Sequence, residues 1–269
     1  EVAEHFQAKS NQNYNIARNL PLANNAKVDV LPWLANAVSV KKITGVPQVA
    51  IVIDDAGLNR KLTEHAIRLA GPLTFSFLPY ATKLKLQVQN AKKSGHEIMA
   101  HVPMEPDNPL IDPGPQFLAT GQTIKEIKKR LEWSLSRVPG IVGINNHMGS
   151  RFTSDVRGMK IVMEEVSLRG LLFLDSRTSH HTVGAKLAKR YKVPFVIRNI
   201  FLDHEPGLSF IQSQLIKLED HAKLHGFAVA ICHPHDTTIE ALYQWLPIVA
   251  EKGLVLVPVS AIAAISSRV

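Results

Sequence analysis

The amino-acid sequence predicts an α/β protein whose strands form a closed or nearly closed (β/α) barrel. Short apolar segments alternate with amphipathic stretches of helical length over most of the chain, a pattern typical of a parallel sheet with helical crossovers. Glycines stand between several helical stretches and the apolar segments that follow, where they suit a helix C-terminal stop. Seven or eight repeats of this unit favour a barrel of seven to eight strands over an open doubly wound sheet, which remains the alternative.

The expected strands are apolar runs rich in small and β-branched residues, and they are too short for helices. The first of them, in "QVAIVIDDAGLNR", runs directly into two adjacent carboxylates, Asp54 and Asp55. Folding gains little from two acids at one strand tip, so the pair points to a function. The expected strands cover residues 49–53, 73–78, 97–100, 141–144, 171–174, 194–197, 228–231 and 254–257.

The expected helices are amphipathic and carry recognisable end signals. Thr123 with Glu126 offers a capping box, in which each residue satisfies a backbone N–H of the other. The helical stretches cover residues 60–70, 83–94, 123–137, 156–169, 208–224 and 237–250, and glycines at 95, 170, 226 and 253 follow four of them.

The chain divides into two unequal parts. Residues 1–46 are rich in Asn, Gln and Ala without clear periodicity, and we expect an extended or partly ordered N-terminal arm. Trp33 and Leu34 are the residues expected to tether this arm. Residues 47–269 are expected to form one barrel domain.

Composition narrows the functional classes. The chain has 269 residues, 45% of them hydrophobic and 20% charged, and no apolar run reaches the roughly 18–20 residues of a membrane span. The net charge of +8 raises the question of a nucleic-acid partner, but the basic residues form no stripe and no aromatic platform accompanies them, so none is expected. The only cysteine, Cys232, excludes an internal disulfide and a cysteine-based zinc site.

Polar side chains follow nearly every expected strand, at the edge where the functional groups of a (β/α) barrel gather. Aspartate and asparagine there are also common helix caps, but histidine is not, and three strand ends carry one: His101, His147 and His233. Carboxylates with imidazoles suit zinc or a similar divalent cation. Adjacent aspartates in a strand point in opposite directions, so we expect a turn that brings Asp54 and Asp55 to one mouth.

Five segments in order, "IVIDDAG", "HVPMEP", "NNHMGS", "FLDSRT" and "CHPH", resemble the divergent polysaccharide deacetylase branch of the NodB-type superfamily. The resemblance implies a distorted, NodB-like (β/α) barrel and metal-dependent removal of N- or O-acetyl groups from sugar polymers by a metal-activated water. It implies Asp54 as general base, Asp55 and His101 as metal ligands, and His233 as general acid. Because the family is mostly exported, it also implies a periplasmic or otherwise exported protein.

Two departures from the superfamily pattern stand out. "HVPMEP" has Glu105 and no second histidine, and "NNHMGS" replaces the usual arginine–proline–aromatic motif. We predict that His147 supplies the missing ligand and completes an Asp55, His101 and His147 set; the alternative is that metal binding is lost. Five further residues are expected either to contact the substrate or to support the metal ligands: Glu105, Asn146, Arg151, Asp175 and His235.

The sequence therefore predicts a metal-dependent hydrolase, with zinc as the expected ion and a carbohydrate polymer or oligosaccharide as the expected partner. The alternative is a non-catalytic, carbohydrate-binding or envelope-associated protein on the same barrel, since a fold does not fix a function. The identity of the glycan and the oligomeric state stay open at this stage.

Overall fold

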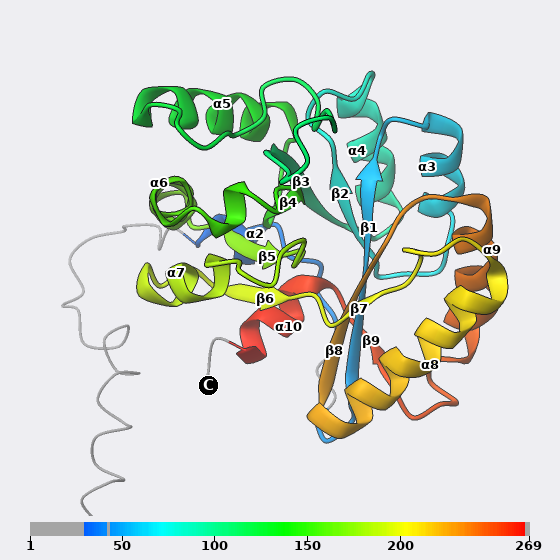
Figure 1. Ribbon diagram of the computed structural model, residues 1–269. Helices are drawn as coiled ribbons and strands as arrows, with labels where there is room; N and C mark the ends of the chain where they lie inside the picture. Colours follow the sequence, from blue (N-terminus) through cyan, green and yellow to red (C-terminus); the bar gives the residue numbers. More distant parts are fainter. Residues whose placement is uncertain (1–29, 42–43, 267–269) are drawn as a thin grey trace, which may run out of the picture. The chain divides into compact units, whose positions relative to one another are not determined.

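A curved sheet of parallel strands organises the chain in the computed structural model, which describes residues 30–41 and 44–266 (Figure 1). The strands follow one another in the order β6-β5-β4-β3-β2-β1-β8-β7, and β9 also pairs with β1. The predicted barrel is confirmed. The strands are β1 (Gln48–Ala56), β2 (Thr74–Phe77), β3 (Glu97–Met104), β4 (Gly143–Met148), β5 (Leu172–Asp175), β6 (Phe195–Ile197), β7 (Ile200–Phe201), β8 (Phe227–Cys232) and β9 (Val255–Leu256).

The barrel is distorted where its two edges meet. β6 pairs with β5 and β7 pairs with β8, yet only Arg198 and Asn199 separate β6 from β7 along the chain. The Arg198 N–H donates to the carbonyl of Asp175 on β5, and the Asn199 N–H donates to the carbonyl of Val229 on β8. One extended segment, residues 195–201, therefore pairs with one edge strand and then with the other.

Most of the helices cover the outer face of the sheet, and two of the predicted helix-end signals are confirmed. The Thr123–Glu126 capping box is present, and Gly226 ends a helix in the left-handed conformation. The helices are α2 (Pro32–Ala35), α3 (Arg60–Ile67), α4 (Leu84–Lys93), α5 (Ile124–Arg137), α6 (Val156–Leu168), α7 (Gly184–Arg190), α8 (Leu208–His225), α9 (Asp236–Trp245) and α10 (Val259–Ser266), with short 3-10 turns at Phe152–Ser154 and Leu246–Ile248.

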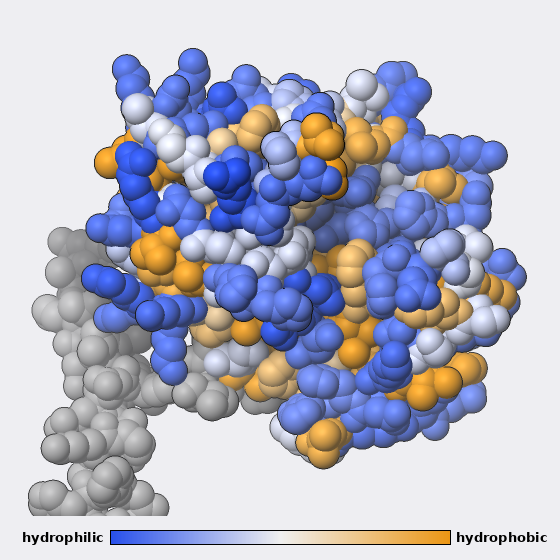
Figure 2. All heavy atoms as spheres, viewed as in Figure 1, coloured by the Kyte–Doolittle hydropathy of each residue, from blue (hydrophilic) through white to orange (hydrophobic). Residues whose placement is uncertain are grey.

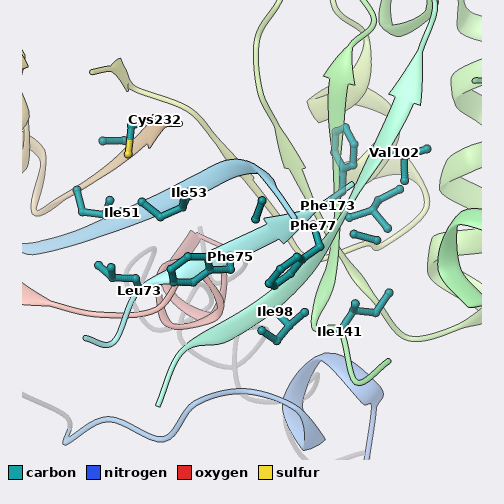
Figure 3. Packing of buried hydrophobic residues seen from close by; sticks show 14 of the residues in the cluster. Ile51, Ile53, Leu73, Phe75, Phe77, Ile98, Val102, Ile141, Phe173 and Cys232 are labelled. Carbon is teal, nitrogen blue, oxygen red and sulfur yellow. The ribbon is translucent and has the colours of Figure 1, made fainter. Parts of the chain in front are cut away.

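Alternation along the strands divides the apolar core into two layers. In β1, Ile51 and Ile53 belong to the outer layer between sheet and helices, whereas Ala50 and Val52 belong to the layer inside the barrel. Figure 3 shows the outer layer, with Ile51 and Ile53 near Cys232. Because a strand turns successive side chains to opposite faces, this pattern fixes which side chains at the strand ends point inward.

Helix α10 packs against the inner layer and is held by a buried acid. Ile262 and Ala263 of α10 belong to the inner cluster. At the start of α10, the Ser260 N–H donates to Glu97 Oε1 over 3.0 Å, and the Ser260 hydroxyl donates to Glu97 Oε2. Burial raises the pKa of Glu97, against the hydrogen bonds that lower it. A carboxyl group at this position replaces a cap that α10 lacks in its own sequence, and it faces the positive end of the helix.

Replacing this acid tests how far it stabilises the barrel. We expect Glu97→Ala to lower the free energy of unfolding by about 1–3 kcal/mol, because the buried Ser260 N–H loses its acceptor. Urea denaturation followed by circular dichroism measures this. An unchanged unfolding midpoint would show that the contact contributes nothing.

The N-terminal prediction is only partly covered by the described residues. Residues 1–29, most of the predicted arm 1–46, lie outside them. Trp33 is buried and its backbone N–H donates to the carbonyl of Gly170, as a tether would require, whereas Leu34 is about half exposed. Residues from Leu31 onward belong to one compact unit.

The surface seen in Figure 2 is mainly hydrophilic, with hydrophobic side chains in several separate patches. Among the described residues, no helix combines the length and the apolar character needed to cross a membrane.

Candidate metal and proton-transfer site

Inward-pointing polar side chains gather at the carboxyl ends of the strands. The alternation that buries Val52, Met99 and Ile231 inside the barrel also turns the residue two positions further along each strand inward. Those positions hold Asp54, His101 and His233. Polar groups at this mouth thus stand directly above an apolar interior.

Asp55 reaches the same mouth through a break in the strand. A regular strand would point it to the outer face, away from Asp54. Instead Asp55 has a φ of +54°, and the pairing of β1 with β2 slips between Ile53 and Ala56. A bulge with a left-handed residue redirects a side chain, and aspartate tolerates this conformation better than most residues. The two acids therefore reach one mouth, as expected, but through a bulge within β1 rather than through a turn.

Asp55, His101 and His147 converge on one point. Asp55 Oδ1 lies 3.3 Å from His101 Nε2 and 2.9 Å from His147 Nδ1, and one ligand atom from each residue lies within 4.8 Å of the other two. Although burial raises the pKa of Asp55, the two histidine rings outweigh burial and hold that pKa well below its usual range. The carboxylate is therefore charged and faces two nitrogens.

The geometry of this group fits a divalent cation. Asp55 Oδ1 is buried and makes no hydrogen bond with any described residue, although both ring nitrogens approach it. A buried oxygen without a hydrogen-bond partner is unfavourable unless something else binds it. One carboxylate and two imidazoles leave a fourth position open, as in catalytic zinc sites. Asp55, His101 and His147 are thus suited to hold such an ion.

Asn145 of β4 orients both the ligand His101 and the neighbouring acid Asp54. Its Nδ2 donates to Asp54 Oδ1 and Oδ2 over 2.9 and 3.0 Å, so its Oδ1 must be the acceptor side. His101 Nδ1 lies 2.8 Å from that oxygen and can donate to it, so Nε2, the nitrogen that faces Asp55, is the one available to bind a cation. The Ser76 hydroxyl donates to the same oxygen. This network selects the tautomer of His101 that can bind a metal.

Asp54 is a buried acid, with 3% of its surface exposed. Burial raises its pKa, while His101, His233 and the hydrogen bonds from Asn145 act in the opposite direction. Its Oδ2 lies 3.5 Å from His101 Nε2. Asp54 is therefore a carboxyl group held beside the ligands in a position to exchange a proton.

His233 forms a pair with Asp203, which follows β7. His233 Nδ1 lies 3.1 Å from Asp203 Oδ1, and the other carboxylate oxygen accepts the backbone N–H of His233 and the hydroxyl of Thr238. Burial lowers the pKa of His233, but Asp203 outweighs it and raises that pKa to about 9. The Nε2 atom of His233 lies 3.9 Å from Asp55 Oδ2. A protonated imidazole therefore stands at the edge of the ligand group at neutral pH.

The His233–Asp203 pair predicts a pH dependence of stability. The folded-state pKa lies above the ordinary value near 6.5, so the stabilisation is complete below about pH 6.5 and is lost as pH rises through about 9. In the presence of a chelator, we expect the free energy of unfolding to fall by roughly 1–3 kcal/mol over this interval. Asp203→Asn should largely abolish the fall. Equal pH slopes for the two proteins in urea denaturation would contradict this assignment.

Comparison with known proteins identifies the family. Residues 51–263 match the family model described as divergent polysaccharide deacetylase. The chain belongs to the divergent polysaccharide deacetylase family. It is 34% identical over 200 residues to an uncharacterized protein of Haemophilus influenzae, covering 74% of this chain and 71% of that protein. It is 33% identical over 199 residues to uncharacterized protein YibQ of Escherichia coli, covering 73% of this chain but only 61% of the relative.

Solved structures place this family member in the NodB-like fold predicted from the sequence. The crystal structure of an uncharacterized protein of Agrobacterium tumefaciens has a TM-score of 0.84 at 30% identity, and the match covers 87% of this chain and 95% of that one. A family 4 carbohydrate esterase from Streptomyces lividans, solved in complex with acetate, has a TM-score of 0.50 at 13% identity, covering 78% and 91%. At that identity the likeness shows the fold alone.

Glu105 and Arg151 of this deacetylase-family chain lie beside each other, outside the ligand group. Glu105 Oε2 accepts the backbone N–H and the hydroxyl of Thr120 over 2.6 and 2.7 Å, which fastens the loop between β3 and α5. Arg151 Nε lies 3.8 Å from Glu105 Oε1, and its side chain is 55% exposed. These contacts make Glu105 a loop anchor, and they leave Arg151 accessible at the surface.

Asn146 and Asp175, two further predicted site residues, are used in loop contacts. Asn146 accepts the Ser176 N–H, and Asp175 accepts the Arg177 N–H and the Thr182 hydroxyl. Alternation explains this, because both residues neighbour an inward-pointing position and therefore point away from it. His235 is exposed, near His233 and apart from the Asp55 group.

Several residues of the mouth lie outside the predicted set of site residues, among them Asn145, Asp203, Arg198 and Tyr80. Arg198 donates from Nε to the carbonyl of Ser176 over 2.7 Å, and its guanidinium lies 5.1 Å from the ring centroid of Phe201. Burial, followed by the charge of Asp55, raises the pKa of Tyr80 to about 12, so its hydroxyl remains a donor. Asn145 has one sequence signal: it lies two residues before His147 and therefore on the same inward face of the strand.

Proposed function

We propose that this chain is a metal-dependent carbohydrate deacetylase that hydrolyses an N- or O-acetyl group. The observation that carries the proposal is the convergence of Asp55, His101 and His147 between two proton-transfer groups, Asp54 and His233. The family supports a carbohydrate substrate. Zinc is the proposed ion, because a carboxylate with two imidazoles is a donor set that zinc favours.

The roles of the protein groups follow from their protonation and position. A divalent cation held by the three ligands would polarise the acyl carbonyl and lower the pKa of an attacking water. Asp54, oriented by Asn145, accepts the proton of that water. His233, kept protonated by Asp203, donates a proton to the leaving amine or alkoxide.

A non-catalytic carbohydrate-binding protein is the second candidate, favoured by one observation. Glu105 stands in the segment where the superfamily has a second histidine ligand, and it anchors a loop instead. In the proposed enzyme His147, on the adjacent strand β4, takes over that ligand position.

Acetate release separates the two candidates. We expect the zinc-loaded chain to release acetate from at least one acetylated oligosaccharide in a panel of N- and O-acetylated glycans. Chelation should abolish the release, and added zinc should restore it. Retention of a glycan without acetate release, at one bound zinc per chain, would instead establish a binding protein.

We also propose that the protein is periplasmic or otherwise exported, so that an envelope glycan would be accessible to it. The support is the sequence resemblance to a family that is mostly exported. Fractionation of cells that produce the full-length protein, with marker enzymes for each compartment, tests this. Recovery with the cytoplasmic marker alone would contradict it.

A further inference from the structure

Asp203, His233 and His235 form a second group of potential metal ligands. One ligand atom from each residue lies within 4.8 Å of the other two. The two nitrogens of the His233 ring face different groups, since Nδ1 lies 3.1 Å from Asp203 Oδ1 while Nε2 is 3.9 Å from Asp55 Oδ2. The second group is thus separate from the Asp55 group, and His233 stands between them.

The local backbone holds the two histidines together. The His235 N–H donates to the carbonyl of His233 over 2.8 Å, which closes a tight turn around Pro234. The two ring centroids are 5.7 Å apart. His235 is exposed, and the described residues offer its ring no hydrogen bond, so its side chain is free to reorient. Asp203 is fixed by the Thr238 hydroxyl and the His233 N–H, both on its Oδ2, which leaves Oδ1 facing the rings.

We propose that Asp203, His233 and His235 form a second site for a divalent cation of the zinc type. The donor set is again one carboxylate and two imidazoles, which is the chemistry zinc prefers. Ligand atoms of a tetrahedral zinc site lie about 3.3 Å apart, given bond lengths near 2.0–2.1 Å. The ligand atoms of the three residues lie within 4.8 Å of one another, and rotation of the exposed His235 ring brings its nitrogen to the shorter spacing.

The second site binds more weakly than the first. A cation on His233 Nδ1 replaces the hydrogen bond with Asp203, and the displaced proton passes to solvent. At the Asp55 group, by contrast, Oδ1 has no hydrogen bond to lose among the described residues. Zinc therefore fills the Asp55 group first and the Asp203 group at higher concentration.

Occupation of the second site inhibits the enzyme, a consequence that rests on the proposed function. A general acid must carry a proton on each ring nitrogen before it donates one. His233 bound to a cation through Nδ1 has lost the first of these protons, so it no longer serves as an acid near neutral pH. Low zinc activates the chain and excess zinc slows it.

Zinc titration of the metal-stripped chain by calorimetry tests the second site without any activity measurement. We expect two ions per wild-type chain, and in His235→Ala we expect the weaker affinity to fall at least tenfold while the tighter one is unchanged. His225→Ala is the matched control, because His225 is also exposed and forms a close ring pair with His221 on α8, at 4.3 Å. This control should still bind two ions.

Three results would overturn the inference: one ion per wild-type chain at excess zinc, a second ion that persists in His235→Ala, or its loss in His225→Ala. The unfolding midpoint of each variant confirms that it is folded, as expected for exposed residues. Failure of the proposed function is distinguishable, because it appears as absent acetate release or loss of the tighter ion and leaves the weaker ion unaffected.

Discussion

Asp54→Asn is expected to reduce acetate release by about 10²–10⁴-fold while the protein still binds one tight zinc ion per chain. The substitution preserves the shape of the side chain and lets its amide oxygen accept the hydrogen bond from Asn145. It removes the proton acceptor beside the ligand group, and Asp54 is not one of the three converging ligands. Turnover and metal binding therefore separate in this variant.

Asp203→Asn is a useful comparison for Asp54→Asn, because it also replaces a buried carboxylate of the mouth by an amide. It acts through His233, so its effect on turnover should depend on pH, whereas the loss in Asp54→Asn should be present at every pH. Turnover of Asp54→Asn within threefold of wild type, on a substrate that wild type deacetylates, would exclude Asp54 as the general base.

His147→Ala is expected to weaken the tight zinc site by at least a hundredfold, since it removes one of three protein ligands. His147 Nδ1 lies 2.9 Å from Asp55 Oδ1, the shortest approach within the ligand group. The loss should appear as substoichiometric zinc by elemental analysis after dialysis. Activity should fall in parallel at low zinc and recover in part when zinc is raised.

His181→Ala is the matched control for this variant, because His181 is an exposed histidine on the loop after β5. It should retain one zinc ion per chain. Full zinc content in His147→Ala would show that the ligand predicted to replace the missing histidine is not one, and that His101 and Asp55 bind the ion with some other group.

The fold was largely predictable because each strand and helix carries its own periodicity. The segment 195–201 was harder, since Arg198 and Asn199 are polar and look like a loop. Their backbone N–H groups nevertheless pair with β5 and β8, and this pairing closes the barrel. Sequence patterns report burial of side chains, and they do not report where a backbone hydrogen bond goes.

The site was predictable as a set of residue types, but less so as a geometry. His147 followed from the resemblance and from the missing histidine, and the structure brings it to Asp55. The positive φ of Asp55 has no sequence signature beyond the glycine two residues later. The place of Asp175 at a strand end predicts that it belongs to the site, yet it points outward. Counting alternate positions from the buried interior distinguishes such residues better than closeness to a strand end.

A crystal of the zinc-loaded chain, measured at wavelengths on both sides of the zinc edge, tests the central claim most directly. We predict an anomalous peak about 2.0–2.2 Å from Asp55, His101 Nε2 and His147 Nδ1, with a fourth position open toward the mouth. The absence of a peak at this point, in a crystal grown with excess zinc, would contradict a metal-dependent deacetylase at this site.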